Sequence, residues 1–513
     1  MLVRVHGASL YGVEGVRIAI EVDAGSGLPA FHIVGQPDRV VNESRDRIRS
    51  AFRQSGLEFP AGRVTVNLAP TGIPKAGAAL DLPLAVGIAA TQVELPAERL
   101  RSTLYLGELG LDGALRPVQG ALAMLAAGDL GPVSAAIVPL ANLREASFCP
   151  DLEALGATSL AAVVEYLRGE RALALATDMG AAQEPEALAD EPDLAELYGQ
   201  ETGRRALEVA AAGRHNALLM GPPGSGKTLL ARRLPGLLPD LPFDEALEAT
   251  RVHSVAGTLG ARSLILRPPF RAPHHSTSDV GLTGGGRPVR PGEISLAHRG
   301  VLFLDELAEF RRSALEALRQ PLEEGEVRVV RAHGAVRLPA RFQLIAAMNP
   351  CPCGYRGDTR RECCCDEAQL RRYRVRLSGP LLDRIDLHVQ VSPVAWRDMA
   401  GRGDSCESSN AIATRVARAR ERQARRYAGE PYGVNADVPA RDLARYCPLE
   451  PSALGLLERA VERLGLSMRA YVRVLRVART ISDLASEDVI SAARLGEAIG
   501  YRELDRAHAP IGS

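Results

Sequence analysis

Apolar and polar positions alternate in two ways over the first third of this chain. Short β-type runs at residues 16–22, 64–68 and 135–140 are interspersed with helical spacing at 40–54 and 80–90. Strands that alternate with helices are typical of a mixed α/β fold. The pattern therefore predicts an α/β domain at the N-terminus.

A second α/β pattern begins near residue 198. A helical segment at 203–212 precedes an apolar strand at 217–220, and further apolar strands are predicted at 301–304 and 342–348. Beyond residue 408 the spacing is helical with almost no strand signal. No internal repeat of fixed period is evident.

The stretch between these patterns is rich in Ala, Glu, Asp and Pro and has no large apolar cluster, as expected of a solvated acidic linker. We expect four regions. They are an α/β N-terminal domain over 1–175, the linker over 176–197, an α/β core with a parallel sheet over 198–400, and an α-helical C-terminal domain over 401–513.

Composition narrows the class of protein. A chain of 513 residues is too long for a single core. The longest uncharged apolar runs, 82–93 and 117–128, are too short to cross a bilayer, and the first residues lack the apolar segment of a secretory signal. We therefore predict a cytoplasmic protein with no membrane partner.

Charge is balanced overall but unevenly distributed. The 62 basic and 62 acidic residues cancel, yet residues 1–200 carry 15 basic against 25 acidic residues, and 251–430 carry 30 against 20. A basic central region indicates a polyanion partner, although a solvated charged face gives the same counts.

A nucleotide site is indicated directly after the predicted strand 217–220. The next eight residues form the pattern G-x-x-x-x-G-K-T, and helical spacing follows. Backbone N–H groups of such a loop surround phosphates, the lysine reaches the β- and γ-phosphates, and the threonine ligates magnesium. The alternative is a chance glycine-rich loop. The residues are Gly221, Pro222, Pro223, Gly224, Ser225, Gly226, Lys227 and Thr228.

Two carboxylates complete the predicted ATPase. The apolar strand 301–304 ends at Asp305 and Glu306. We expect Asp305 to hold magnesium through water and Glu306 to orient and deprotonate the attacking water. Such a pair is common at strand ends, so the specificity comes from its combination with the phosphate loop.

Two further polar residues are candidates for the same reaction. Asn349 ends the third strand, where it could sense the γ-phosphate or simply form a turn before Pro350. Arg384 could stabilise transition-state charge across a subunit boundary, or pair with Asp383 or Asp386. A nucleotide contacted by a neighbouring subunit implies a closed ring.

Five of the eight cysteines fall between residues 351 and 365. Cys351, Cys353, Cys363 and Cys365 give a C-x-C…C-x-C set that suits tetrahedral zinc, with Cys364 as a possible substitute ligand and free thiols as the alternative. The intervening loop carries Arg356, Arg360 and Arg361, which a metal-bound knob could present to DNA or to a neighbouring subunit.

These segments resemble an AAA+ ATPase of the magnesium-chelatase-like branch. LEEGEVRVVRAHGAVRLPARFQLIAAMNPCPCGY and RYRVRLSGPLLDRIDLHV are similar to the central block of that group. With NLAPTGIPKAGAALDLPLAVGIAA and YLGELGLDGALRPVQG, which resemble the C-terminal domain of Lon proteases, the whole chain is similar to the YifB/ComM family. The resemblance implies a Lon-protease-like N-terminal domain, an AAA+ core and a helical lid.

The resemblance also assigns roles. Lys227 and Thr228 match Walker A, Asp305 and Glu306 match Walker B, Asn349 matches sensor 1, and Arg384 matches the arginine finger. Arg469 resembles sensor 2, although Arg473 lies one turn away on the same helix face. ATP, Mg²⁺ and a hexameric ring are the implied cofactors and assembly.

The Lon-like segment departs from the protease pattern. The protease has its catalytic serine after P-K-x-G-x, where this chain has Ala79 at the end of PKAGAA (74–79), and Leu122 stands where the lysine base is expected. The peptidase dyad is therefore missing, and the domain is better suited to interaction or ring assembly. Lys75 is expected to be a surface or loop residue.

Basic side chains in three segments could meet a polyanion. Residues 324–338 predict a β-hairpin with a turn at 333–334, which resembles the channel hairpin of related ring helicases and carries Arg328, Arg331 and Arg337. Residues 412–427 predict an arginine-rich helix, suited to a polyanion or to the acidic N-terminal domain. The insertion 271–291 is expected to be a flexible loop near the channel, with adjacent histidines that point differently and bind no metal.

Two functions follow from the resemblance. The first is an ATP-driven ring motor that translocates on DNA as a helicase and promotes branch migration in natural transformation. The second is a magnesium-chelatase-like ATPase or chaperone that remodels a protein partner. The basic hairpin and helix favour DNA, single-stranded or branched.

Overall fold

The computed structural model describes residues 2–73, 75–128, 131–179, 192–260, 264–331, 334–358, 361–393 and 407–502. Most of the predicted acidic linker, the predicted boundary at 400/401, and Arg360 lie outside these residues. The four domain ranges therefore remain predictions.

The first third of the chain forms an eight-stranded mixed sheet in the order β10-β9-β8-β5-β1-β2-β4-β3. β1 and β2 pair antiparallel over their whole length, and β3 runs parallel to β4. The strands are β1 (Leu2–Tyr11), β2 (Glu14–Gly25), β3 (Ala30–Val34), β4 (Arg63–Ala69), β5 (Thr103–Tyr105), β8 (Ala135–Pro139), β9 (Glu153–Ala157) and β10 (Ala174–Leu175). A separate two-stranded ribbon consists of β6 (Glu108–Leu109) and β7 (Leu115–Arg116).

Helices cover both faces of this sheet. α1 (Arg39–Gln54), α2 (Asp81–Ala89), α3 (Ala97–Ser102) and α6 (Leu160–Arg168) contribute to one apolar core. α4 (Ala121–Leu125) and α5 (Leu143–Ala146) contribute to a second core around Ala8 and Leu104. The helix predicted at 40–54 begins where Asp38 accepts a hydrogen bond of 2.7 Å from the Val41 amide, which is a helix N-cap.

A five-stranded parallel sheet forms the middle of the molecule in the order β12-β13-β16-β11-β17. The strands are β11 (Ala217–Met220), β12 (Phe270–Arg271), β13 (Val301–Leu304), β16 (Gln343–Met348) and β17 (Leu387–Gln390). Alternate residues of these strands enter different cores: Leu219 and Phe303 belong to one, and Leu218 and Leu302 to the other. Both faces of the sheet are thus buried, which explains its uninterrupted apolar strands.

The helices around this sheet are mostly short. They are α7 (Glu201–Gly213), α8 (Lys227–Arg233), α9 (Phe243–Ala256), α10 (Asp279–Thr283), α11 (Glu293–Leu296), α12 (Arg312–Ala317), α13 (Arg319–Glu324), α14 (Glu367–Val375) and α15 (Gly379–Leu382). The predicted hairpin is present as β14 (Glu326–Arg331) and β15 (Gly334–Pro339).

The C-terminal part is helical, as predicted, and among residues 407–502 the only β pairing is an isolated bridge between Leu449 and Ile490. Its core is continuous with the core beneath α7 and one face of the parallel sheet. The helices are α17 (Ser409–Arg426), α18 (Leu443–Tyr446), α19 (Pro451–Leu464), α20 (Met468–Leu484) and α21 (Ala492–Gly500).

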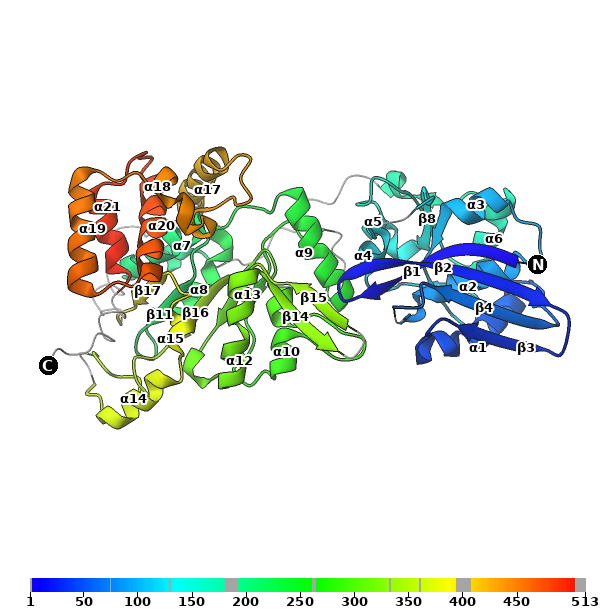
Figure 1. Ribbon diagram of the computed structural model, residues 1–513, viewed down its shortest axis with the longest axis horizontal. Helices are drawn as coiled ribbons and strands as arrows, with labels where there is room; N and C mark the ends of the chain where they lie inside the picture. Colours follow the sequence, from blue (N-terminus) through cyan, green and yellow to red (C-terminus); the bar gives the residue numbers. More distant parts are fainter. Residues whose placement is uncertain are drawn as a thin grey trace.

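Figure 1 shows the N-terminal sheet and the C-terminal helices at opposite ends, with the parallel sheet between them. α4 packs against α9 at the junction of the two sheets, where the Gly120 amide donates a 3.1 Å hydrogen bond to the Ser254 carbonyl. Val13, in the turn between β1 and β2, enters the same apolar core as Val336 of the hairpin. The N-terminal region is therefore packed onto the middle of the molecule through apolar contacts.

No helix within the described ranges combines the length and the apolar character that crossing a membrane requires.

Candidate active site

The phosphate loop connects β11 to α8 at the carboxyl edge of the parallel sheet. Gly224 and Gly226 have φ angles of 75° and 88°, which favour glycine. A Cβ atom on Gly221 would overlap the carbonyl of Val391. The side-chain amide of Gln200 donates hydrogen bonds of 2.9 Å to the Ser225 carbonyl and 2.8 Å to the Ser392 carbonyl, which fixes the loop from outside.

Lys227 is buried at the first turn of α8 and turns back over the loop. Its ammonium group donates hydrogen bonds of 2.7 Å to the Gly221 carbonyl and 2.9 Å to the Pro222 carbonyl. Burial lowers the pKa of Lys227, while the charge of Asp305 acts in the opposite direction. The loop and its cation form one compact unit.

Asp305 links the loop to the end of β13. Its Oδ2 accepts a 2.7 Å hydrogen bond from the Thr228 hydroxyl, and its Oδ1 accepts one of 2.9 Å from the Glu306 amide. Glu306 has φ 51° and ψ 47°, a left-handed conformation that is uncommon for a residue with a side chain. The sheet therefore brings together a hydroxyl and two carboxylates, oxygen donors of the kind that Mg²⁺ prefers.

His275 is a site residue that the sequence analysis missed. Its Nδ1 lies 3.1 Å from Glu306 Oε2, and its ring packs edge-on against Phe310. The adjacent histidines were expected to point differently, and this was wrong, because the His274 and His275 ring centroids are 4.0 Å apart. No local sequence signal marks His275: it reaches Glu306 because it follows β12, which pairs in parallel with β13 and so ends at the same edge.

Asn349 follows β16 at this edge. Its Oδ1 lies 3.4 Å from the Lys227 ammonium, and its backbone carbonyl accepts a 3.1 Å hydrogen bond from the Tyr373 hydroxyl. The structure thus places Asn349 beside the phosphate-loop lysine.

Arg384 lies outside this group. Its guanidinium donates to Glu323 and to the Pro380 carbonyl, neither of which belongs to the phosphate loop. The side chain is buried, and its Nε has no hydrogen-bond partner among the described residues. The alternative pairing predicted with Asp383 or Asp386 is wrong, because Glu323 is the acidic partner.

Those two aspartates pair with the sensor 2 candidates instead. Arg469 is exposed and lies 3.4 Å from Asp383, while the side chain of Arg473 is only 14% exposed and lies 2.8 Å from Asp386. Burial lowers the pKa of Arg473 even beside that carboxylate. Arg469 is therefore the more accessible of the two cations.

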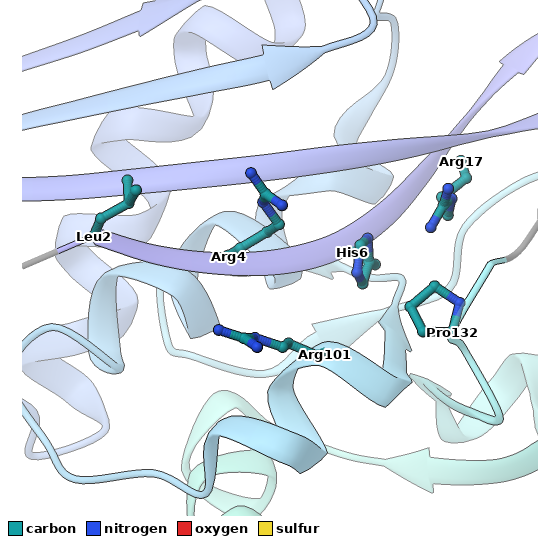
Figure 2. A pocket seen from close by; sticks show the side chains of 6 residues that line it. All are labelled: Leu2, Arg4, His6, Arg17, Arg101 and Pro132. Atoms are coloured by element: carbon teal, nitrogen blue, oxygen red, sulfur yellow. The ribbon is translucent and has the colours of Figure 1, made fainter.

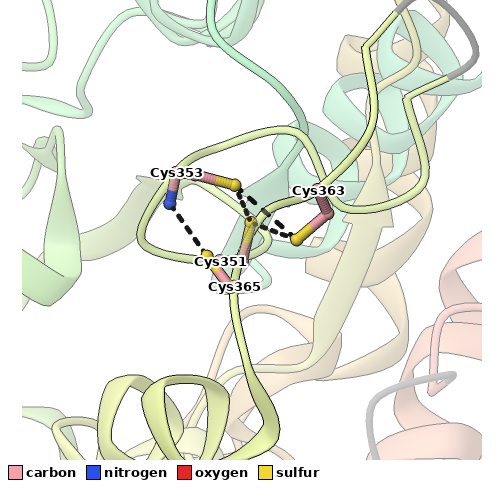
Figure 3. A group of neighbouring side chains, drawn as sticks. All are labelled: Cys351, Cys353, Cys363 and Cys365. Carbon is pink, nitrogen blue, oxygen red and sulfur yellow. Dashed lines mark hydrogen bonds between the residues drawn. The ribbon is translucent and has the colours of Figure 1, made fainter.

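The four predicted zinc ligands converge (Figure 3). Cys351 Sγ lies 3.3 Å from Cys353 Sγ and 3.6 Å from Cys363 Sγ, and the Cys353 amide is 3.4 Å from Cys365 Sγ. All four sulfur atoms lie within 4.8 Å of one another. Four thiolates around a zinc ion, each at about 2.3 Å, lie about 3.8 Å apart, so the donor set fits the metal. Cys364 is exposed and outside the group.

The cysteine loop touches the phosphate loop. A Cβ atom on Gly354 would lie 2.8 Å from Pro223 Cδ, which leaves room only for glycine. Among the predicted basic residues of this loop, Arg361 stacks over Tyr355 with its guanidinium carbon 5.0 Å from the ring centroid. The cysteine loop, residues 351–365, therefore forms part of the wall of the nucleotide site.

The β14–β15 hairpin presents two arginines side by side. Arg328 pairs directly with Arg337 in the strand register, and both are exposed. Glu326 and Glu324 lie 2.6 Å and 3.3 Å from the Arg328 guanidinium. The side chain of Arg331 and the turn residue His333 lie outside the described part of the structure.

The arginine-rich helix predicted at 412–427 is α17, but its cations are largely engaged within the chain. Arg415 lies 2.5 Å from Glu208 of α7, Arg426 donates a 2.8 Å hydrogen bond to Asp483 of α20, and Arg420 donates to the Ala211 carbonyl. These partners lie in α7 and α20, so these three arginines serve packing within the chain, whereas Arg418 and Arg425 are exposed.

The positions of the missing peptidase dyad are buried. Leu122 is fully buried in α4, and Ala79 belongs to the core around Ala8. The expectation of a surface position for Lys75 was wrong, because its side chain is fully buried and donates to the Pro70 carbonyl. Burial lowers the pKa of Lys75.

Comparisons with known proteins cover the whole chain. Residues 193–399 match the family model for magnesium chelatase subunit ChlI, 20–142 match a second ChlI model, and 406–502 match the ChlI C-terminal model. The chain is 43% identical to the competence protein ComM of Haemophilus influenzae and 43% identical to YifB of Escherichia coli, covering 98% of this chain and 97% of each relative. It is 29% identical to the magnesium-chelatase 38 kDa subunit of Cereibacter sphaeroides, over 38% of this chain and 57% of that protein.

Proposed function

Because the chain belongs to the YifB/ComM family of magnesium-chelatase-like proteins, we propose that it is a ring-forming ATPase that translocates on DNA and moves branch points during natural transformation. The observation that carries the proposal is the pair Arg328 and Arg337, which are opposite each other on a hairpin. In the sequence, this hairpin lies between β13 and β16, two strands of the ATPase site. Such a motor would work in the cytoplasm as a hexamer.

ATP hydrolysis would use the groups gathered at the carboxyl edge of the sheet. Thr228 and Asp305 would hold Mg²⁺, which would neutralise charge on the phosphates. Lys227 would bind the β- and γ-phosphates, and Glu306 would take a proton from the attacking water through a carboxylate oxygen. Asn349, at 3.4 Å from Lys227, would respond to the γ-phosphate.

Hydrolysis between subunits would need a cation from a neighbour. Arg384 is our candidate for that arginine finger, and Arg469 is the candidate for sensor 2. Exposure of Arg469 supports its role, and Arg384 would have to exchange Glu323 for the nucleotide when subunits assemble.

DNA binding would use the hairpin. Like charges directly opposite each other on adjacent strands destabilise a sheet. Arg328 is partly neutralised by Glu324 and Glu326, whereas Arg337 has no ion pair in the described chain. A phosphate of the DNA backbone would offset the repulsion without sequence preference. Arg331 remains the third candidate for DNA contact in this segment.

We further propose that Cys351, Cys353, Cys363 and Cys365 hold structural zinc. The sulfur positions and the exposure of Cys364 support this ligand set. The amide of Tyr355 lowers the pKa of Cys353 to about 5 and so favours the thiolate that zinc binds, whereas burial raises the pKa of Cys351. The metal would hold the cysteine loop against Pro223 of the phosphate loop.

A protein-remodelling ATPase is the second candidate, and the match to magnesium chelatase models favours it. The two functions differ in what stimulates hydrolysis. We expect single-stranded or forked DNA to raise the ATPase rate, and DNA affinity to fall steeply with salt. An unchanged ATPase rate at low ionic strength would favour a protein substrate.

Arg337→Ala tests the hairpin within the same assay. We expect weaker DNA binding, a salt slope reduced by about one, and an unchanged ATPase rate without DNA. Arg45→Ala, which removes an exposed arginine from α1 of the N-terminal region, is the matched control. Equal DNA affinities for the two variants would contradict the assignment.

A further inference from the structure

A basic pocket lies on the N-terminal sheet, at the end of β1 that is remote from the ATPase site. The opposite end of β1 carries Tyr11, whose hydroxyl lies against Gly334 of the hairpin. The pocket has a volume of about 480 Å³. Figure 2 shows its lining residues, which come from β1, β2, α3 and the loop before β8: Leu2, Arg4, His6, Arg17, Arg101 and Pro132.

The strand register explains the hollow. Leu2, Arg4 and His6 are alternate residues of β1 and so point from one face of the sheet. Across the strand pair, His6 is opposite Ala19 and Ala8 is opposite Arg17. The small side chain of Ala19 leaves space beside the imidazole, and the apolar core under α4 and α5 begins only at Ala8.

The charge around the hollow is positive. Three guanidiniums line it. Arg4 pairs with Glu21 at 2.5 Å, Glu21 also accepts a 3.1 Å hydrogen bond from Asn67, and Asp23 is opposite Leu2 in the strand register. Arg101 extends from α3 with no ion pair in the described part of the chain, and it is exposed. No carboxylate is among the described residues that line the hollow.

His6 supplies a second, independent indication of a ligand. Its side chain is only 5% exposed, and Nδ1 has no hydrogen-bond partner among the described residues. Buried polar atoms without a partner are rare because they lose their hydration without compensation. Burial, followed by the charges of Arg17 and Arg4, lowers the pKa of His6 and favours the neutral imidazole. In that form Nδ1 can either accept a hydrogen bond from a protonated ligand oxygen or, in the other tautomer, donate one as N–H.

We propose that this pocket binds a phosphate monoester. A monoester carries nearly two negative charges and three terminal oxygens, and guanidiniums bind such groups through several parallel hydrogen bonds. A phosphodiester within a strand is flanked by sugar on both sides, whereas a terminal phosphate can enter a hollow whose floor carries His6. The phosphate could belong to the 5′ end of a DNA strand or to a free nucleoside monophosphate.

The site is independent of the proposed motor activity, so its test uses the full chain with Lys227→Ala, which silences the phosphate loop. Calorimetry with inorganic phosphate and with AMP at low ionic strength should show binding. Arg101→Glu should weaken that binding at least tenfold, whereas Arg45→Glu, the same charge change on the opposite face of the sheet, should change it less than twofold.

His6→Phe keeps the ring but removes both nitrogens, and it should also weaken binding, with the melting temperature as a folding check. If His6→Phe fails to fold, the Arg101→Glu comparison decides alone. Absence of phosphate and AMP binding, or equal affinities for the Arg101→Glu and Arg45→Glu chains, would overturn the proposal.

A pair of oligonucleotides distinguishes the two sources. Tighter binding of a 5′-phosphorylated strand than of the same strand with a 5′-hydroxyl, lost in Arg101→Glu, would assign the pocket to strand ends. Equal binding of the two strands, with AMP still bound in an Arg101-dependent way, would assign it to free nucleotides. Either result supports a monoester site.

Discussion

Asp305 and Glu306 are adjacent in sequence but are held very differently. Both oxygens of Asp305 accept hydrogen bonds, from the Thr228 hydroxyl and the Glu306 amide, so its carboxylate is fixed. The Glu306 side chain is 56% exposed and contacts His275. This difference fits a carboxylate that holds a metal beside one that handles a proton.

Glu306→Gln tests whether Glu306, and not Asp305, accepts the proton. We expect ATP binding to persist and turnover to fall by about 10²- to 10⁴-fold, because the amide cannot accept the water proton. Lys227→Ala is the contrasting variant and should lose nucleotide binding. Steady-state hydrolysis and equilibrium binding of a fluorescent ATP analogue measure the two effects, and unimpaired turnover in Glu306→Gln would refute the assigned base.

We expect His275 to be a positioning residue, since it contacts Glu306. His275→Ala should change kcat several-fold with little change in KM for ATP, because the imidazole contacts the base and not the phosphate loop. His275→Asn keeps a polar hydrogen-bonding group and should restore part of the rate. A purely structural role would instead lower the melting temperature of both variants and leave kcat of the folded enzyme unchanged.

At the scale of elements, the cysteine loop is the most consequential insertion. It follows β16 directly and contacts the phosphate loop through Gly354. A cysteine loop ordered by metal would stabilise the nucleotide site at Pro223, in addition to the Gln200 hydrogen bond to Ser225. We therefore expect loss of the metal to lower both the stability of the protein and its affinity for ATP.

Cys363→Ser and Cys364→Ser form a matched pair for this element. We expect one bound zinc per chain in the wild type and in Cys364→Ser, and loss of the metal in Cys363→Ser. Loss of the site should lower the melting temperature by several degrees, at about 2–4 °C per kcal/mol for a domain of this size. Metal analysis and thermal unfolding measure both, and identical behaviour of the two variants would remove the zinc proposal.

The elements of the ATPase site were predictable because each has a local signature. The glycine pattern, the apolar strand before Asp305 and the hairpin turn are all continuous in sequence. What escaped prediction depends on contacts between distant segments. His275 reaches Glu306 only because β12 pairs with β13. Lys75 is buried where its backbone is hydrogen-bonded to the distant residues Gln36 and Asp38, and the α17 arginines are engaged because α7 and α20 lie beside them.

For the whole molecule, the proposed ring requires each nucleotide to be shared by two protomers. In the single chain Arg384 is bound to Glu323 and Pro380, so its charge is already satisfied. Release of Glu323 would have to accompany assembly. The free energy of that exchange would help to couple nucleotide binding to subunit contact.

Hybrid assemblies test the sharing. Arg384→Ala and Glu306→Gln protomers should each be nearly inactive, since an arginine finger contributes about 10³- to 10⁵-fold to the rate. Mixed together, they should recover a measurable fraction of activity, because some interfaces join an intact Glu306 to an intact Arg384. Absence of recovery, or a monomer in the presence of ATP, would contradict the ring.

The contact between the β1–β2 turn and the hairpin has a practical consequence for anyone dissecting this protein. Val13 shares a core with Val336, and Tyr11 lies against Gly334. Deleting the first domain would expose the apolar side chains of the hairpin that pack against it. A change in the DNA affinity of the shortened chain could then result from a disturbed hairpin as readily as from the missing domain. Point changes on the outer face of the sheet are the cleaner tool.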